Sequence, residues 1–224
     1  IFVVSAYAGI TDLLLEHKKT GAAGVYSNFI ADDAGATWEQ ALNAVHAVMR
    51  AKNAEIFVGA GNRKIADAFV DERICGLRDC LNNVGQLREH GRFRLTEPLA
   101  DLREMLAAAG EAHSAHNTAL LLRDRGVNAV FVDLSGWQKH DRPSLDEQIR
   151  QGLKNIDPVK QLPIVTGYAY CQGGMVSRFD RGYSEMTFSR LAVITGAREA
   201  IIHKEFHLSS SDPGLVGKRN ARKI

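Results

Sequence analysis

The apolar run from Leu162 to Tyr170 is the feature that most constrains the fold of this chain. It has the length of a strand and contains β-branched residues, with Pro163 near its start and Gly167 within it. Such continuously apolar strands are typical of parallel sheets that helices cover on both faces. Other strand-like runs alternate with helical segments and lie at residues 1–6, 55–59, 127–134 and 200–203. The sequence therefore predicts an α/β fold, a three-layer αβα sandwich with a mainly parallel central sheet.

A glycine turn and an arginine follow this run. Residues 172–174 (Gln-Gly-Gly) predict a turn, so that residues 168–179 would form a hairpin over the end of the sheet. Residues 180–185 (Asp-Arg-Gly-Tyr-Ser-Glu) then lead into a helix, for which Ser184 is the expected N-cap. The free N–H groups of a helix start and the fork of Arg181 together favour a carboxylate or phosphate. The segment indicates an anion site, although Arg181 could instead pair with a neighbouring acidic residue.

Residues 1–14 (Ile-Phe-Val-Val-Ser-Ala-Tyr-Ala-Gly-Ile-Thr-Asp-Leu-Leu) are typical of a buried strand that breaks into a loop. Ser5 and Thr11 offer hydroxyl groups where the strand ends, and Gly9 lets the backbone approach a ligand closely. Open α/β sheets bind small molecules at this place. A plain connection from strand to helix, with Thr11 as its N-cap, would explain the same residues.

These segments resemble the aspartokinase branch of the amino acid kinase family. Residues 166–168 (Thr-Gly-Tyr) and 180–185 are similar to its Val-Thr-Gly-Phe and Gly-Arg-Gly-Gly-Ser-Asp, with Tyr183 at the second glycine and Glu185 for aspartate, changes that we expect to crowd the site. Residues 1–14 resemble its Val-Val-Ser-Ala-x-x-Gly-x-Thr-(Asn/Asp)-Leu-Leu. Residues 110–114 (Gly-Glu-Ala-His-Ser) resemble its Gly-Glu-x-x-Ser.

The resemblance implies an amino acid site. The family's glutamate contacts the amino acid substrate, so Glu111 would face the ammonium group of aspartate and Arg181 would hold a carboxylate. Thr11 and Ser184 would complete the substrate site, and Glu185 would act with Arg181 at the transfer centre. The alternative for Glu111 is an ordinary solvated charge on a helix.

Residues 200–216 resemble the family's nucleotide segment, Thr-Asp-Val-Asp-Gly-Val-Tyr-Thr-Ala-Asp-Pro-Arg, only in part. His203 and Lys204 stand where the family has Thr-Asp, a variant similar to that of the aspartokinases of ectoine biosynthesis. The residues that the resemblance places toward the nucleotide are Ser5, Gly9, His203, Lys204, Ser209 and Asp212.

The activity that the resemblance implies is transfer of the γ-phosphoryl group of ATP, with Mg²⁺, to the side-chain carboxylate of L-aspartate. The family's chains begin with a Lys-x-Gly-Gly-Thr-Ser loop and usually end in ACT domains, so we expect residues 1–224 to be one catalytic domain truncated at both ends, from a homo-oligomeric protein. Two alternatives stay open: another carboxylate or carbamate kinase of the same fold, and a non-catalytic member that binds an amino acid or a nucleotide.

Composition argues against other classes of protein. No segment approaches the roughly twenty apolar residues of a membrane span, and a net charge of +2 gives no reason to expect nucleic acid. Cys75, Cys80 and Cys171 lack zinc spacing, and His113 and His116 have no third ligand near them in sequence. We therefore expect reduced thiols, no metal site of these residues, no membrane partner and a cytoplasmic location.

Two capping motifs and one long segment predict helices. Thr37 with Gln40 and Ser144 with Glu147 have the spacing of capping boxes. Residues 62–94 are typical of a long amphipathic helical arm, a lid or an interface.

Overall fold

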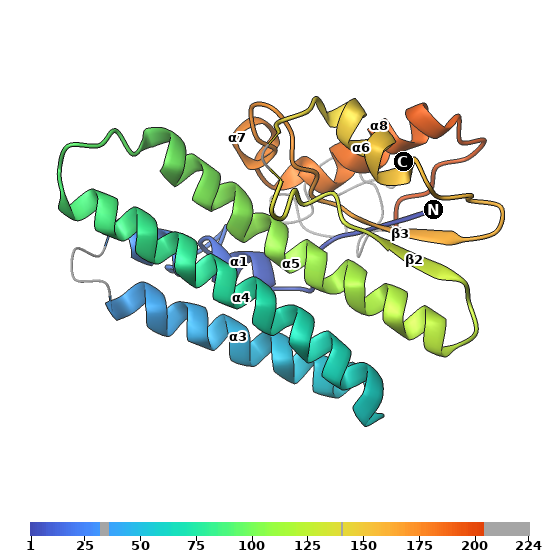
Figure 1. Cartoon of the computed structure of the whole chain (residues 1–224), viewed down its shortest axis with the longest axis horizontal. Helices are drawn as coiled ribbons and strands as arrows, with labels where there is room; N and C mark the ends of the chain where they lie inside the picture. Colours follow the sequence, from blue (N-terminus) through green and yellow to red (C-terminus); the bar gives the residue numbers. More distant parts are fainter. Residues whose placement is uncertain (32–35, 140, 204–224) are drawn as a thin grey trace, which may run out of the picture.

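Three parallel strands form the sheet in the computed structural model, which describes residues 1–31, 36–139 and 141–203 (Figure 1). They are β1 (Phe2–Val4), β2 (Ala129–Val132) and β3 (Leu162–Thr166), in the order β1-β3-β2. Ile164 of β3 is in register with Phe2 of β1 and with Phe131 of β2. The apolar run is thus the central strand, which is why it lacks a polar face.

Helices cover both faces of this sheet (Figure 1). On one face, Ile164 packs with Ala115 and Ala119 of α5 (Thr96–Asp124). On the other, Val165 packs with Ile149 of α6 (Leu145–Leu153) and Leu191 of α8 (Tyr183–Thr195). Successive side chains of a strand point to opposite faces, so Ile164 and Val165 belong to different cores. The αβα sandwich predicted from the sequence is confirmed.

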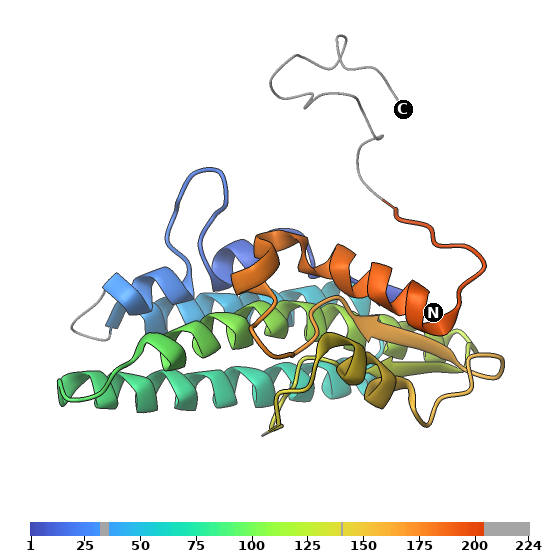
Figure 2. The same cartoon turned by 90° about the horizontal axis from the view of Figure 1, so that it is seen from above.

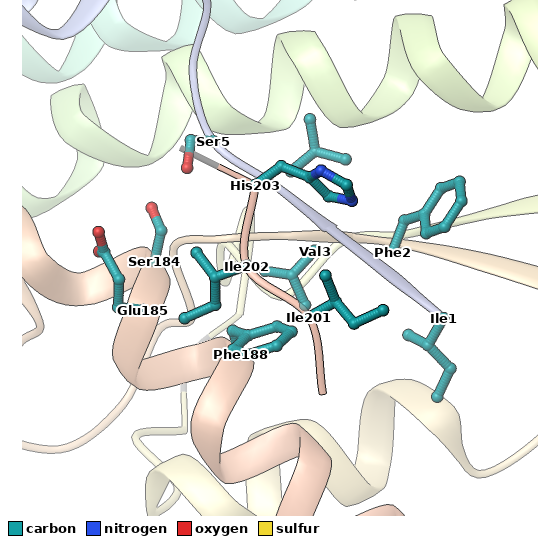
Figure 3. A pocket seen from close by; sticks show the side chains of 11 residues that line it. Ile1, Phe2, Val3, Ser5, Ser184, Glu185, Phe188, Ile201, Ile202 and His203 are labelled. Atoms are coloured by element: carbon teal, nitrogen blue, oxygen red, sulfur yellow. The ribbon is translucent and has the colours of Figure 1, made fainter. Parts of the chain in front are cut away.

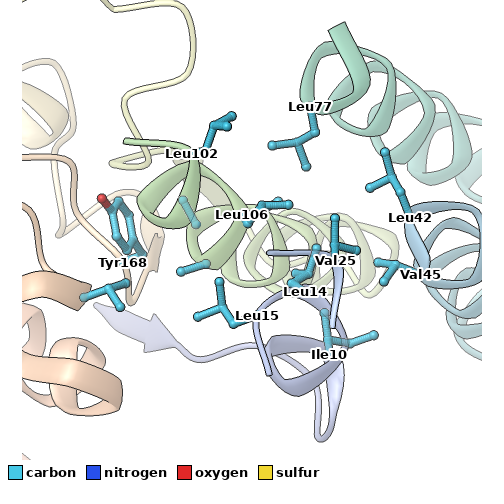
Figure 4. Packing of buried hydrophobic residues seen from close by; sticks show 14 of the residues in the cluster. Ile10, Leu14, Leu15, Val25, Leu42, Val45, Leu77, Leu102, Leu106 and Tyr168 are labelled. Carbon is cyan, nitrogen blue, oxygen red and sulfur yellow. The ribbon is translucent and has the colours of Figure 1, made fainter. Parts of the chain in front are cut away.

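A helical bundle extends beyond one end of the sheet (Figure 2). It consists of α3 (Ala36–Ile56), α4 (Ala60–Glu89) and the first half of α5, with the shorter α1 (Ile10–Leu14) and α2 (Val25–Ala31) packed against them. Its core is the largest of the described chain and includes Leu14, Leu42, Leu77 and Leu106 (Figure 4).

Helix α4 confirms the helix expected over residues 62–94. Val70, Ile74, Leu77 and Leu81 recur at intervals of three and four, and all four are buried. Among the described residues, no helix is long and apolar enough to span a membrane.

Two predicted strands are wrong. Residues 55–59 belong to the end of α3 and the link to α4, where Phe57 packs with Ala66 and Leu120. A short apolar run at the end of a helix has the same pattern as a short buried strand. Residues 200–203 form no strand either, and Ile201 and Ile202 are 59% and 51% exposed.

The predicted hairpin over residues 168–179 is also wrong. Gly173 and Gly174 do form a turn, with φ of 84° and 69°. The chain then enters the short helix α7 (Val176–Phe179) and the 3₁₀ helix η1 (Asp180–Gly182) instead of a second strand.

One of the two predicted capping boxes is present. The backbone N–H of Glu147 donates to the Ser144 hydroxyl, and the Ser144 N–H donates back to the Glu147 carboxylate. The prediction for Thr37 is wrong because α3 already includes Ala36, which places Thr37 inside the helix.

Candidate active site

A cavity of about 290 Å³ lies where the chain leaves the carboxyl ends of β1 and β3. Its walls come from the loop after β1, from the middle of α5 and from the start of α8. Parallel strands end at one edge of the sheet, which brings these distant segments together. Seven residues singled out in the sequence line it: Ser5, Gly9, Thr11, Glu111, Arg181, Ser184 and Glu185.

A second cavity, of about 450 Å³, adjoins the first along β1. Ser5, Ser184 and Glu185 line both cavities and lie together at one end of the second (Figure 3). Its other walls are mainly apolar, with Ile202 and Phe188 among them. The two cavities thus share a border that carries polar side chains.

Glu111 is a buried carboxyl group in the wall of the first cavity. It is 2% exposed, so the alternative of a solvated helix charge is wrong. The hydroxyl of Ser184 donates to its Oε1 at 2.6 Å, whereas its Oε2 meets no donor with hydrogen-bond geometry in the described chain. Burial raises the pKa of Glu111 to about 8; Ser184 and the backbone N–H groups of Tyr168 and Ala6 partly offset this.

Gly167 makes the close approach to Glu111 possible. A Cβ atom at this position would overlap Oε2 of Glu111 and would lie 2.8 Å from Oγ of Ser184. The glycine of the Thr-Gly-Tyr segment is therefore required by packing against the site, since any side chain would displace the carboxyl group.

Arg181 does not pair with its neighbours in sequence. Its guanidinium group donates to the carboxylate of Asp12 and to the backbone carbonyl of Glu16. Burial acts to raise the pKa of Asp12, but the hydrogen bonds from Arg181 and from the backbone N–H of Lys18 outweigh it, and the pKa is lowered. Asp12 therefore stays ionised and holds Arg181 at the cavity wall.

Sequence reasoning missed this role of Asp12. Asp12 lies within residues 1–14, the segment that was predicted to be near the ligand. A carboxylate in that segment was the one indication in the sequence that an acidic partner for Arg181 exists. The two residues are 169 positions apart, so only the fold pairs them.

Helix α8 starts two residues earlier than predicted. Gly182 occupies its N-cap position, and Ser184 lies within the first turn, where its hydroxyl serves Glu111 instead of capping. Tyr183, expected to crowd the site, is 2% exposed and its ring packs edge-on against Tyr168, with centroids 5.7 Å apart. The tyrosine thus belongs to the core and also lines the first cavity.

Of the six residues expected near the nucleotide, three line the cavities and three lie outside the described residues. Ser5 lines both cavities, Gly9 lines the first and His203 lines the second. Lys204, Ser209 and Asp212 lie outside the described residues.

The sequence profile of the amino acid kinase family matches residues 1–224. The chain belongs to the amino acid kinase family. A protein named Aspartate kinase Ask_Ect from Stutzerimonas stutzeri (strain A1501) is 50% identical over 217 residues, which is 97% of this chain and 46% of that protein. The Aspartokinase of Schizosaccharomyces pombe is 29% identical over 132 residues, 54% of this chain and 25% of the relative.

A second fungal protein, the Aspartokinase of Candida albicans, is 26% identical over 131 residues, 50% of this chain and 24% of the relative. The chain thus spans less than half the length of each of these three relatives. The resemblance to the aspartokinase branch of the amino acid kinase family is confirmed, and the two cavities lie at the sheet edge where an open α/β fold binds ligands.

Proposed function

We propose that the intact protein is an aspartate kinase, which transfers the γ-phosphoryl group of ATP to the side-chain carboxylate of L-aspartate. The observation that carries this proposal is the wall of the first cavity, which presents a buried carboxyl group, Glu111, and a guanidinium group, Arg181. A free amino acid offers an ammonium group, for which a carboxyl oxygen of Glu111 can be the acceptor, and a carboxylate, which the guanidinium group of Arg181 can bind. The names of the three relatives agree with this substrate.

In the proposed complex, Oε2 of Glu111 accepts a hydrogen bond from the ammonium group of aspartate, which supplies the donor that this oxygen lacks. Arg181 binds the α-carboxylate, with the hydroxyl groups of Thr11 and Ser184 beside it. The substrate side chain then points toward the border of the two cavities, where Glu185 and Ser5 lie.

ATP would occupy the second cavity, with its γ-phosphate at the same border. A side-chain oxygen of aspartate attacks the γ-phosphorus, and the bond from that phosphorus to the bridging oxygen of ADP breaks. The chemistry needs positioning and charge neutralisation more than covalent help. Ser5 and Ser184 line both cavities, and in this proposal they orient the two reacting groups.

Mg²⁺ belongs to this proposal as part of the nucleotide complex. The described residues contain no group of three or more His, Cys, Asp or Glu side chains that would hold a metal ion. Mg²⁺ is commonly held by substrate phosphates and water with one or two carboxylates, and Glu185 is the carboxylate nearest that role here. When bound, the ion would neutralise phosphate charge.

The proposal includes residues 1–224 as the catalytic domain, a cytoplasmic location where ATP is available, and a homo-oligomer of the intact protein without nucleic-acid or membrane partners.

The test is steady-state kinetics of the full-length natural protein with L-aspartate, L-glutamate and Mg-ATP, comparing wild type with Arg181→Ala. Loss of a charge-assisted contact to a carboxylate should raise the KM for aspartate about tenfold to a hundredfold and leave the KM for ATP nearly unchanged. Arg178→Ala is the matched control, since Arg178 is exposed and three positions away.

Three results would contradict the proposal. Equal losses for aspartate and ATP would remove Arg181 from the amino acid site. Turnover of glutamate in place of aspartate would indicate another carboxylate kinase of this fold. Aspartate binding without any turnover by the folded full-length protein would indicate a non-catalytic binding member.

A further inference from the structure

Helix α5 carries a second buried carboxyl group, Glu104, which does not line either cavity of the candidate active site. It is 6% exposed and accepts five hydrogen bonds. The donors are the backbone N–H groups of Met175, Val176 and Ser177 at 2.9, 3.0 and 2.9 Å, the hydroxyl of Ser177 at 3.0 Å and the hydroxyl of Tyr168 at 2.8 Å.

The five contacts are those of an ionised carboxylate. Every partner is a donor, and an ionised carboxylate is the one form of this side chain that accepts at all its positions. In the described part of the chain Glu104 makes no ion pair with a cationic side chain. Its charge is stabilised instead by the N–H groups at the start of α7, which the carboxylate satisfies in return.

The backbone around Glu104 is shaped to this carboxylate. Gly174 has a φ of 69°, in the left-handed region that favours glycine. A Cβ atom there would overlap Oε1 and lie 2.8 Å from Cδ of Glu104. The Gly173-Gly174 turn therefore brings the backbone onto Glu104, which explains why these glycines lead into a helix and not into a hairpin.

The segment that Glu104 holds leads directly to the active site. Helix α7 continues into η1, which carries Arg181, and then into α8, which carries Ser184. Ser184 is bound to Glu111, which is seven residues after Glu104 on α5. Seven residues are two turns, so both glutamates lie on one side of α5, about 10 Å apart along its axis. Arg181 thus lies in a segment, residues 175–184, that is bound to α5 at both ends. Glu104 binds its start and Glu111 binds its end, and this segment is called the strap below.

We propose that Glu104 is a positioning residue for the amino acid site. By fixing the start of α7, it sets where Arg181 and Ser184 meet the cavity, although it touches neither of them nor the substrate. This inference rests on the proposed aspartate kinase function, because it assigns Arg181 to the substrate carboxylate.

The test is Glu104→Gln in the full-length protein, with steady-state kinetics and amide hydrogen exchange. A glutamine amide turns one acceptor oxygen into a donor, so that N–H groups of α7 lose their partner. The KM for aspartate should rise about tenfold, a factor that corresponds to ~1.4 kcal/mol, with little change in the KM for ATP. Exchange should become faster at residues 175–177 and also at residues 181–184.

The matched control is Glu97→Gln, the same chemical change at an exposed position in the first turn of α5. It should change neither the KM for aspartate nor the exchange rates. Should Glu104→Gln fail to fold, Ser177→Ala removes one hydroxyl donor to Glu104 and leaves the three backbone bonds. It should shift the KM and the exchange rates in the same direction by a smaller factor.

Two results would overturn the inference. One is faster exchange at residues 175–177 alone with an unchanged KM for aspartate, which would make Glu104 a local cap. The other is no change in either measurement. A wild-type protein that fails to phosphorylate aspartate would overturn the proposed function, and exchange at residues 181–184 would still decide whether Glu104 positions the segment.

Discussion

Glu104 and Glu111 are two buried carboxyl groups on one side of one helix, and their surroundings differ. Glu104 accepts five hydrogen bonds, from three backbone N–H groups and two hydroxyl groups. Glu111 accepts one well-formed hydrogen bond, from Ser184; the backbone N–H groups of Tyr168 and Ala6 also act on it, but its Oε2 meets no donor with hydrogen-bond geometry among the described residues. A buried polar atom without a partner costs stability, and in the proposed complex the ammonium group of the substrate supplies the partner of this oxygen. The number of donors thus distinguishes Glu104, the proposed positioning residue, from Glu111, the proposed acceptor of the substrate ammonium group.

The largest effect in this comparison is expected at Gly167, which lies against the open carboxyl group. Gly167→Ala places a methyl group on Oε2 of Glu111 and on Ser184. Displacement of a binding group by about 1 Å costs about a hundredfold in kcat/KM, so we expect a loss of at least this size with aspartate. Steady-state kinetics measures it.

Gly61→Ala is the control for Gly167→Ala, since a Cβ atom at Gly61 of α4 meets nothing within 4 Å. We expect it to keep full activity. A Gly167→Ala enzyme with a wild-type kcat/KM would mean that the substrate does not use Glu111.

The covered central strand and the edge of the sheet where the cavities lie could be predicted because they follow from local patterns. The apolar run at residues 162–170 requires a covered central strand, and strands that are parallel gather Ser5, Thr11 and Ser184 at one edge. Glu104 could not be predicted. Its partners are 64 to 73 residues away, and its local sequence is that of any helix.

The wrong hairpin prediction and the missed partner of Arg181 have the same cause as the failure to predict Glu104. The Gly173-Gly174 turn has the pattern of a hairpin, and only the carboxylate that receives the next three N–H groups makes it the start of a helix. Asp12 likewise becomes the partner of Arg181 only when the fold joins the two ends of the described chain. Tertiary partners decide both cases, and a single sequence does not contain them.

The second prediction uses pH to separate the two carboxyl groups. Burial raises the pKa of Glu111 to about 8, so the group is neutral below this pH and ionised above it. If the ionised form binds the ammonium group of aspartate, the KM for aspartate should fall about tenfold between about pH 7 and pH 9. Initial rates at several pH values measure this dependence.

Glu111→Gln should remove this dependence while raising the KM at about pH 9, because the glutamine has no proton to lose in this range. Glu104→Gln should raise the KM for aspartate by the same factor at every pH, so that the pH dependence of this KM stays unchanged. A KM that rises with pH in the wild-type enzyme would contradict the role of an ionised Glu111.

The smallest expected effect concerns two buried tyrosines that pack edge-on, one beside each carboxyl group. The hydroxyl of Tyr168 donates to the carboxylate of Glu104, whereas the hydroxyl of Tyr183 has the neutral hydroxyl of Thr11 as its polar neighbour. Hydrogen bonds to charged groups contribute about 1.5–3 kcal/mol and those between neutral groups about 0.5–1.5 kcal/mol. Tyr168→Phe should therefore lower the free energy of unfolding by about 1 kcal/mol more than Tyr183→Phe.

Urea denaturation of both variants at one pH measures this difference, and each variant serves as the control of the other because both lose one buried hydroxyl and keep the ring. The activities should follow the opposite order, since Thr11 and Tyr183 both line the first cavity, the proposed site of the amino acid. Equal destabilisation by the two substitutions would show that the hydroxyl of Tyr168 adds little to the support of Glu104. The position of the strap would then depend on the three hydrogen bonds from backbone N–H groups of α7 to Glu104. Those three bonds alone would then distinguish the surroundings of Glu104 from those of Glu111.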